Sequence, residues 1–520
     1  MTTTEEFLQR RVKRRQQFRT LQLQRHQRQR IALSTVAFMA MSTDTNKTTR
    51  RRGPRQAAER SERMQRDPTT GNFVPFAPTD TQWYFMYILN PNIGSSKFQK
   101  LFRNRFRMSY SCFQTHLQEL SDDATFRQWS TSSKDAAGKD SAPLGLLLLG
   151  ALRYLGRAWT FDDLEEQTAI SAEIHRSFYH VYTQWCSTTL YKKYVTYPTL
   201  DEAKEYSRDY ELAGFPGCIG SGDGTHVMMH RCPWKLIHYH KSYKLGQPAR
   251  NYNVFVNHRR LIMACTNGHP AKWNDMTTVK YDKFAQLIAE GKLFGDDEED
   301  DEEDDEEDDE EDDEEDVDDF FFQLKEKKAD GSISFVWYRG CYTIVDNGYL
   351  DWSTTIPPMK SYDTYAEMRW SKWLESMRKD VECVFGILKG RFTVLKKGIT
   401  LHGIDACDKT FLTCCALHNI ILLHDEADQD SSTPELPQQG PTQSNTSESA
   451  QERRTPSNND LPLSLRPFAD ENGVIFVHKL DQHYFRNKLI HHHSIQHEQN
   501  LLKWPNGNGL TPPENIVEHS

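Results

Sequence analysis

The sequence has few cysteines and no pairing pattern among them. Ten cysteines are scattered over 520 residues, and no Cys-x-x-Cys pair occurs. Cysteines this sparse are typical of reduced thiols and argue against a disulfide-stabilised secreted framework. A zinc site made of Cys218, His226, His230 and Cys232 is an alternative, but this spacing fits no zinc module. Neither disulfides nor zinc are therefore expected to organise the fold.

The sequence also lacks a continuous apolar run long enough to span a bilayer. The run at residues 31–41 follows an arginine-rich lead and is too short. A signal or transit peptide is the alternative, weakened by Glu5 and Glu6 in that lead. We therefore expect no membrane-spanning segment.

Charge is distributed unevenly along the chain. The formal net charge is −10, but residues 296–319 contain 23 Asp or Glu in 24 positions, so the remainder carries −10 + 23 = +13. Residues 1–66 hold 17 Lys or Arg against 5 Asp or Glu. Basic clusters such as residues 10–15 and 50–52 attract phosphates and serve as nuclear-import signals, although a solvated disordered tail has the same composition. The pattern indicates a nearly neutral body with a basic arm and an acidic insert.

Composition changes divide the chain into five segments. We expect a mostly disordered basic arm (1–80), a helical region (81–210), an α/β domain (211–424) interrupted by the acidic insert, a Ser/Thr/Pro/Gln-rich linker (425–465) and a C-terminal tail (466–520). Ser109, Thr160 and Ser171 are expected helix N-caps. Residues 143–155 are predicted to form a buried helix, and residues 253–257 and 260–266 an antiparallel hairpin.

Two short predicted helices, opened by Thr160 and Ser171, have helix-turn-helix spacing. This arrangement would present Glu173, His175, Arg176 and Tyr179 to a DNA groove. Most small helical pairs do not bind DNA, so packing within a helical bundle remains the alternative.

Four acidic residues are candidate metal ligands. Asp223 follows a short predicted strand in Gly-Ser-Gly-Asp-Gly-Thr-His, and Asp346 follows another in Ile-Val-Asp-Asn-Gly. Asp275 lies in Asn-Asp before a predicted helix that runs to residue 289, where it could simply be a cap. Glu382 lies at the edge of a helical apolar stripe, in register with Arg378 and Lys389. Carboxylates without neighbouring zinc ligands favour Mg²⁺ or Mn²⁺.

These motifs, in this order, resemble the transposase domain of PIF/Harbinger DNA transposons, a DDE-type endonuclease family. The resemblance covers about residues 214–423. It implies a ribonuclease H-like α/β catalytic domain, preceded by a helix-turn-helix-like region. It also implies catalytic roles for Asp223, Asp275 and Glu382, which with Asp346 would be ligands of Mg²⁺ or Mn²⁺.

The resemblance further implies a nuclear enzyme that cuts and joins DNA at transposon ends and cooperates with a separate Myb-like DNA-binding protein. Arg176, Arg378, Lys389 and Arg391 are the expected DNA-binding residues, and a homo-oligomer is compatible with such an enzyme. Residues 270–273, Pro-Ala-Lys-Trp, depart from the Pro-Gly-Ser often found before the second aspartate. The alternative function is a domesticated, non-cleaving DNA-binding or chromatin-associated protein. The acidic tract is either a tolerated repeat expansion or an inhibitory polyanion that competes with DNA.

Overall fold

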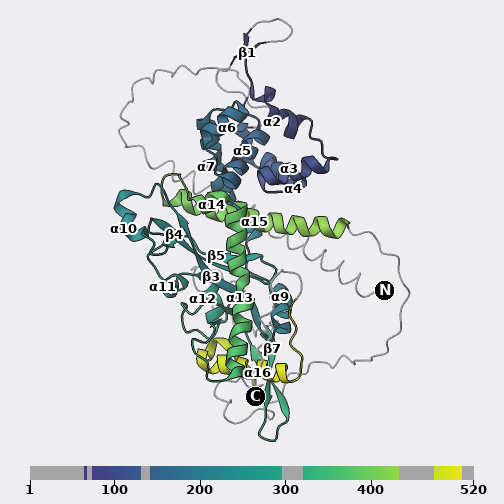
Figure 1. The fold of residues 1–520 in the computed structure, drawn as a ribbon, viewed down its shortest axis with the longest axis vertical. Coiled ribbons are helices and arrows are strands. Elements are labelled where there is room, and N and C mark those ends of the chain that lie inside the picture. The colour runs from purple at the N-terminus through teal and green to yellow at the C-terminus, as the bar shows by residue number, and fades with distance from the viewer. Residues whose placement is uncertain (1–63, 67–72, 130–140, 295–319, 433–472, 506–520) are drawn as a thin grey trace, which may run out of the picture. The chain divides into compact units, whose positions relative to one another are not determined.

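The computed structural model describes residues 64–66, 73–129, 141–294, 320–432 and 473–505 (Figure 1). Apart from Met64, the described residues belong to one compact unit, residues 65–520. Most of the basic arm, the acidic tract and most of the predicted linker lie outside the described residues. Helices and sheets are mixed along the chain, in agreement with the expected α/β class.

The first part of the larger unit is helical. A small two-stranded sheet, β1 (Met64–Arg66) with β2 (Phe73–Pro75), precedes it. The helices are α2 (Gln82–Tyr84), α3 (Ser96–Phe106), α4 (Tyr110–Asp122), α5 (Leu144–Arg157), α6 (Phe161–Thr168), α7 (Ala172–Trp185), α8 (Tyr191–Tyr194) and α9 (Leu200–Leu212). The side chains of Ser109, Thr160 and Ser171 accept hydrogen bonds from the first turns of α4, α6 and α7, which confirms the three predicted caps.

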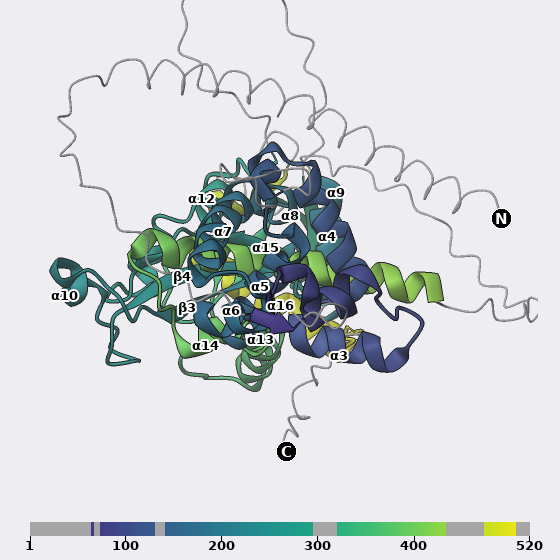
Figure 2. The same cartoon turned by 90° about the horizontal axis from the view of Figure 1, so that it is seen from above.

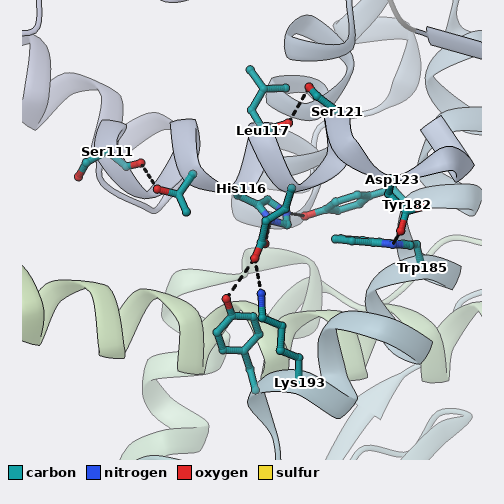
Figure 3. A network of polar contacts seen from close by, with 11 residues as sticks. Ser111, His116, Leu117, Ser121, Asp123, Tyr182, Trp185 and Lys193 are labelled. Atoms are coloured by element: carbon teal, nitrogen blue, oxygen red, sulfur yellow. Dashed lines mark hydrogen bonds and ion pairs between the residues drawn. The ribbon is translucent and has the colours of Figure 1, made fainter. Parts of the chain in front are cut away.

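A polar network joins α4 to α7 and α8 (Figure 3). His116 Nε2 is 2.9 Å from the hydroxyl of Tyr182, and Trp185 Nε1 donates to Asp123 Oδ2 over 2.9 Å. Glu119 forms an ion pair with Lys193 and another with His116. Burial raises the pKa of Glu119, but the interactions with His116 and Lys193 outweigh burial and hold it at about 2. The network therefore fixes α4 against its neighbours through an ionised carboxylate.

The central sheet has the order β10-β9-β3-β4-β5, and the short β6 pairs with β4. Its strands are β3 (Cys218–Met228), β4 (Ala249–Val256), β5 (Ile262–Cys265), β6 (His269–Pro270), β9 (Tyr342–Ile344) and β10 (Thr355–Ile356). The pairs β3–β4 and β4–β5 are antiparallel, whereas β9 is parallel to both β3 and β10. The predicted hairpin corresponds to β4 and β5, whose turn includes Arg260 with φ of +64°.

Two local predictions were wrong. Asp223 does not end its strand, because β3 continues to Met228 through antiparallel pairing with β4. The single helix expected up to residue 289 is divided into α11 (Asp275–Val279) and α12 (Lys283–Glu290). Asn274 caps α11 and Asp282 caps α12, so the second cap interrupts the helix. Asp275 is the first residue of α11 and is not the cap itself.

Two long helices complete the core around the sheet. Helix α13 (Tyr365–Arg391) contacts β3 and β4, and its inward stripe includes Trp370, Leu374 and Val381. Helix α14 (Thr393–Lys397) packs against α5. Helix α15 (Ile404–Ser432) extends into the predicted linker and contains a window, Ile404–Asp425, that is long and apolar enough to cross a membrane. The expectation that no such stretch exists was wrong, but 78% of this window is buried within the protein, as in the core helix of a soluble domain.

A second, three-stranded sheet has the order β11-β8-β7. Strands β7 (Phe321–Lys327) and β8 (Ile333–Arg339) form a hairpin, and β11 (Ile475–Phe476) joins β8 from the C-terminal segment. Helix α16 (Gln482–Glu498) packs on β7. The edge-strand amides of Lys325 and Lys327 donate to His492 Nδ1 and His491 Nε2 over 2.8 and 3.3 Å. The C-terminal segment thus supplies a strand to this sheet and covers its edge.

Candidate active site

Asp223 lies on β3, and Asp346 follows the end of the adjacent parallel strand β9 by two residues. Ser221 of β3 pairs with Ile344, the last residue of β9. Each aspartate stands two residues beyond this pair, and neighbouring strands are about 4.8 Å apart. The two carboxylates therefore lie within electrostatic reach of each other, although they are 123 residues apart (346 − 223) in the sequence.

Arg378 connects this pair of strands to Glu382. Its Nη1 lies 3.5 Å from Asp223 Oδ2, and its Nη2 lies 2.8 Å from Glu382 Oε1. The i,i+4 spacing on α13 puts Arg378 and Glu382 on one face of the helix. Asp223 and Glu382 thus lie on either side of one guanidinium group.

Asp275 approaches from the first turn of α11. A Cβ atom added to Gly224 would lie 2.8 Å from Asp275 Oδ1, and one added to Gly348 would lie 3.2 Å from Asp275 Oδ2. Side chains at these two glycines would therefore crowd the carboxylate. Asp275 lies beside the residue that follows Asp223 and beside the turn that follows Asp346.

The carboxylates influence one another electrostatically. The pKa of Asp223 is raised to about 6, mainly by burial and also by Asp275 and Asp346, against the opposing effects of the Gly224 amide and Arg378. Burial also raises the pKa of Asp275; Lys244 opposes that shift and Asp346 adds to it. Three acids thus lie within electrostatic reach of one another in a partly desolvated site.

A buried polar layer supports the strand ends. The hydroxyl of Tyr349 donates to Asn253 Oδ1, and Asn253 Nδ2 donates to Asp282 Oδ2 over 2.7 Å. Asn251 Nδ2 donates to Thr278 Oγ1 over 3.2 Å. Sequence reasoning missed these residues. The alternating Asn251 and Asn253 of β4 were the available signal, because buried amides require partners.

The carboxylate oxygens of this site are suitable ligands for a hard divalent cation, but they are not arranged as a complete set of metal ligands. Carboxylate oxygens are the ligands that Mg²⁺ prefers. A bound cation would also reduce the electrostatic repulsion between these carboxylates. Among the described residues, however, no group of three or more His, Cys, Asp or Glu side chains is arranged to hold a metal ion. Arg378 instead contacts both Asp223 and Glu382. The alternative zinc site has no support within the same residues, and Cys218 is fully buried.

The predicted DNA-binding residues occupy different environments. Lys389 Nζ donates to Thr225 Oγ1 over 2.9 Å, next to Asp223 along β3. Arg391 Nη1 is 3.1 Å from His418 Nδ1, in a packing contact between α13 and α15. Arg176 is about half exposed and forms an ion pair with Glu173. Arg378 and Lys389 therefore belong to the candidate active site, whereas Arg391 and Arg176 lie in separate contacts.

Two residues predicted to face a DNA groove are buried instead. The ring of His175 is hydrogen-bonded to Thr168 Oγ1 at 2.7 Å, and the hydroxyl of Tyr179 is 3.2 Å from Thr410 Oγ1. The prediction failed for His175 and Tyr179 because α7 packs this face against α6 and α15.

Comparison with protein families identifies one related stretch. Residues 321–430 match the family of plant transposon proteins. The match supports a transposon-derived protein. It spans β7 to α15 and includes Asp346, Arg378 and Glu382, while Asp223 and Asp275 precede it. No curated protein and no solved structure matches the chain.

Proposed function

We propose that this transposon-derived protein is a metal-dependent DNA endonuclease of the PIF/Harbinger transposase type, which cuts and joins DNA at transposon ends. The observation that carries the proposal is the approach of Asp346 to Asp223 beyond the paired residues Ser221 and Ile344, with Glu382 facing Asp223 across Arg378. Carboxylates gathered from neighbouring strands and a helix that crosses them are an arrangement that can hold catalytic metals at a phosphodiester.

The topology around the site supports a ribonuclease H-like catalytic domain. An antiparallel set, β3 to β5, is followed by the parallel strands β9 and β10. A helix carrying Glu382 then packs across β3. This order delivers one carboxylate from each of two central strands and one from a helix.

The chemistry is a displacement at phosphorus. Asp223, Asp346 and Glu382, with Asp275 beside them, would hold Mg²⁺ or Mn²⁺, which when bound activates the attacking oxygen and stabilises the leaving one. A water attacks the phosphodiester, the bond to the 3′ oxygen breaks, and the product ends are a 3′ hydroxyl and a 5′ phosphate. The freed 3′ hydroxyl then attacks target DNA in a second displacement of the same kind.

Two cationic side chains at the site would orient the DNA. Lys389 lies beside Thr225, one residue beyond Gly224, and Arg378 faces Asp223. Both can bind non-bridging phosphate oxygens, and Arg378 can move from the carboxylates to the phosphate when the carboxylates bind a cation. The proposal includes a nuclear location and a Myb-like DNA-binding partner protein.

The alternative is a non-cleaving DNA-binding protein of the same origin. One observation favours it: within the part of the chain that the structure describes, Arg378 already compensates two of the acids, and no three ligands form a metal group. Such a protein would bind DNA with or without a divalent cation and leave it intact.

A nicking assay separates the two functions. The full chain is incubated with supercoiled plasmid carrying the ends of its element, with Mg²⁺, with Mn²⁺ and with EDTA. Asp223→Asn, Asp346→Asn and Glu382→Gln should each lower nicking at least about 100-fold while DNA binding persists. Asp275→Asn should lower it less, because this side chain enters from α11 rather than from the paired strands.

Glu375→Gln is the matched control. Glu375 is exposed on the same helix as Glu382, and the variant should nick like the wild type. Nicking that persists in Asp223→Asn or Glu382→Gln would refute the assignment, and cation-independent binding without nicking would establish the alternative.

A further inference from the structure

An excursion between β3 and β4, residues 230–248, exposes three large aromatic side chains. Trp234 is 84% exposed, Tyr239 is 64% exposed and Tyr243 is 84% exposed. The excursion contains α10 (Ile237–His240), which lies at the periphery of the larger unit in both views (Figures 1 and 2). We call residues 230–248 the aromatic arm. Exposed aromatic groups gathered in one segment indicate a binding surface.

The base of the aromatic arm is fixed to the sheet. The amide of Met229 donates to the carbonyl of Pro248 over 2.9 Å, at the point where the arm leaves and rejoins the strands. His226 Nδ1 is 2.8 Å from Ser242 Oγ, and the Ser242 side chain is fully buried. Residues 239–243 alternate between exposed and buried, with His240 and Ser242 inward. The aromatic groups therefore project from an anchored backbone.

The charge along the arm and its flanking sequence is of one sign. Residues 224–274 contain no Asp or Glu and eight Lys or Arg. These are Arg231, Lys235, Lys241, Lys244, Arg250, Arg259, Arg260 and Lys272. Three of them, Lys235, Lys241 and Lys244, alternate with the exposed aromatic residues along the arm and are themselves exposed. A surface that interleaves cations with aromatic rings suits a polyanion that carries flat apolar groups, which is the chemistry of a nucleic acid.

The arm begins next to the candidate active site. His226, which holds Ser242, is three residues beyond Asp223 on β3. DNA held at the carboxylates would therefore have its neighbouring nucleotides within reach of the arm.

We propose that the aromatic arm stacks on unpaired bases of the DNA strand beside the cleaved phosphodiester. Trp234, Tyr239 and Tyr243 supply the stacking surfaces, and Lys235, Lys241 and Lys244 bind the adjoining phosphates. Bases inside a duplex stack on each other and leave no face for these rings, so the arm selects DNA whose ends are unpaired. The position beside the cleaved bond rests on the proposed nuclease function; the preference for unpaired bases does not.

Binding measurements without metal test the arm apart from cleavage. Full-length protein in EDTA is titrated into two DNA duplexes at one salt concentration, one fully paired and one with an unpaired end that carries 2-aminopurine. The wild type should bind the unpaired end more tightly and quench the 2-aminopurine fluorescence. The triple variant Trp234→Ala, Tyr239→Ala, Tyr243→Ala should lose at least roughly tenfold in affinity for the unpaired end. Its affinity for paired DNA should change by less than about threefold, because phosphate contacts dominate there.

Two controls make the outcome decisive. Phe335→Ala removes an aromatic ring that is 55% exposed on the other sheet and should change neither affinity. The triple variant Lys235→Gln, Lys241→Gln, Lys244→Gln should bind both DNAs more weakly, by a similar factor. The mutated aromatic side chains are exposed, so circular dichroism and the unfolding temperature should stay at wild-type values. The proposal would be overturned if the triple aromatic variant bound the unpaired end as tightly as the wild type does. It would also be overturned if the variant lost affinity for both DNAs by the same factor.

The cleavage assay separates this proposal from the proposed function. Nicking by wild-type protein without a preference for unpaired ends would remove the arm's role alone. A preference for unpaired ends without nicking would support the arm and reject the nuclease.

Discussion

Replacing Arg378 with glutamine should make the candidate active site bind divalent cations more tightly. The guanidinium lies between Asp223 and Glu382, where it competes with any other cation for the same oxygens. Glutamine retains part of the length and hydrogen-bonding capacity of the arginine side chain but carries no charge. The carboxylates should then accept Mn²⁺ without first releasing an ion pair.

The size of the effect follows from the two contacts. Arg378 is 13% exposed, Asp223 is 22% exposed and Glu382 is 48% exposed, so solvent weakens the contact with Glu382 more than the one with Asp223. After this screening each contact contributes about 0.5–1 kcal/mol. Their combined loss corresponds to a gain in Mn²⁺ affinity of about 5- to 30-fold. DNA binding should weaken in the same variant, because a phosphate ligand is lost.

Electron paramagnetic resonance of free Mn²⁺ measures this affinity at neutral pH without DNA. Lys379→Gln removes the same charge from the next position of α13, where the side chain is exposed, and serves as the control. If folded Arg378→Gln protein bound Mn²⁺ no more tightly than Lys379→Gln protein, the competition between Arg378 and a cation would be refuted.

Three further predictions concern stability. Asp223→Asn should stabilise the metal-free protein at neutral pH by up to about 2 kcal/mol. The pKa of Asp223 is raised to about 6, mainly by burial, so the cost of ionising it is absent below about pH 4, grows between pH 4 and pH 6, and is fully present above pH 6. The difference in unfolding temperature between variant and wild type should therefore vanish in acid. Glu119→Gln should lower the free energy of unfolding by about 1 kcal/mol near pH 7. The pKa of Glu119 is held at about 2, so its stabilising contribution is present above about pH 4.5 and is lost as the pH falls toward 2. A difference in urea midpoint between variant and wild type that persisted at pH 2 would contradict this prediction. Phe485→Ala should lower the free energy of unfolding by about 3–5 kcal/mol, because Phe485 is fully buried against Phe322 and Tyr342. If the variant unfolded at the same temperature as the wild type, the C-terminal segment would not contribute to the core.

Local structure was predictable where a few neighbouring residues decide it. Ser109, Thr160 and Ser171 each cap a helix as expected, and residues 144–155 of the predicted buried helix fall within α5. The second sheet was not foreseen in full, because β11 pairs with a strand far away in the sequence. Such a pairing leaves no periodic signal in either segment.

The candidate active site likewise combines features that local sequence predicts with features that depend on tertiary packing. The i,i+4 spacing of Arg378 and Glu382 predicts that they share a helix face, and they do. The contact between Arg378 and Asp223 depends on how α13 crosses β3, and no local pattern encodes that packing. The roles of the four acids came from the resemblance and stay predictions until the carboxylate variants are assayed.

The late position of β11 and α16 has a consequence for synthesis of the protein. The smaller sheet receives its third strand only from residues 475–476, and α16 covers its edge afterwards. A ribosome must therefore translate residue 476 before this sheet can close, about 140 residues after β8. Frameshifts or premature stop codons between β8 and β11 would leave β8 without its partner and expose apolar surface to quality-control proteases. Sequence decay in the codons of β11 and α16 should thus silence the protein as effectively as decay at its acidic residues.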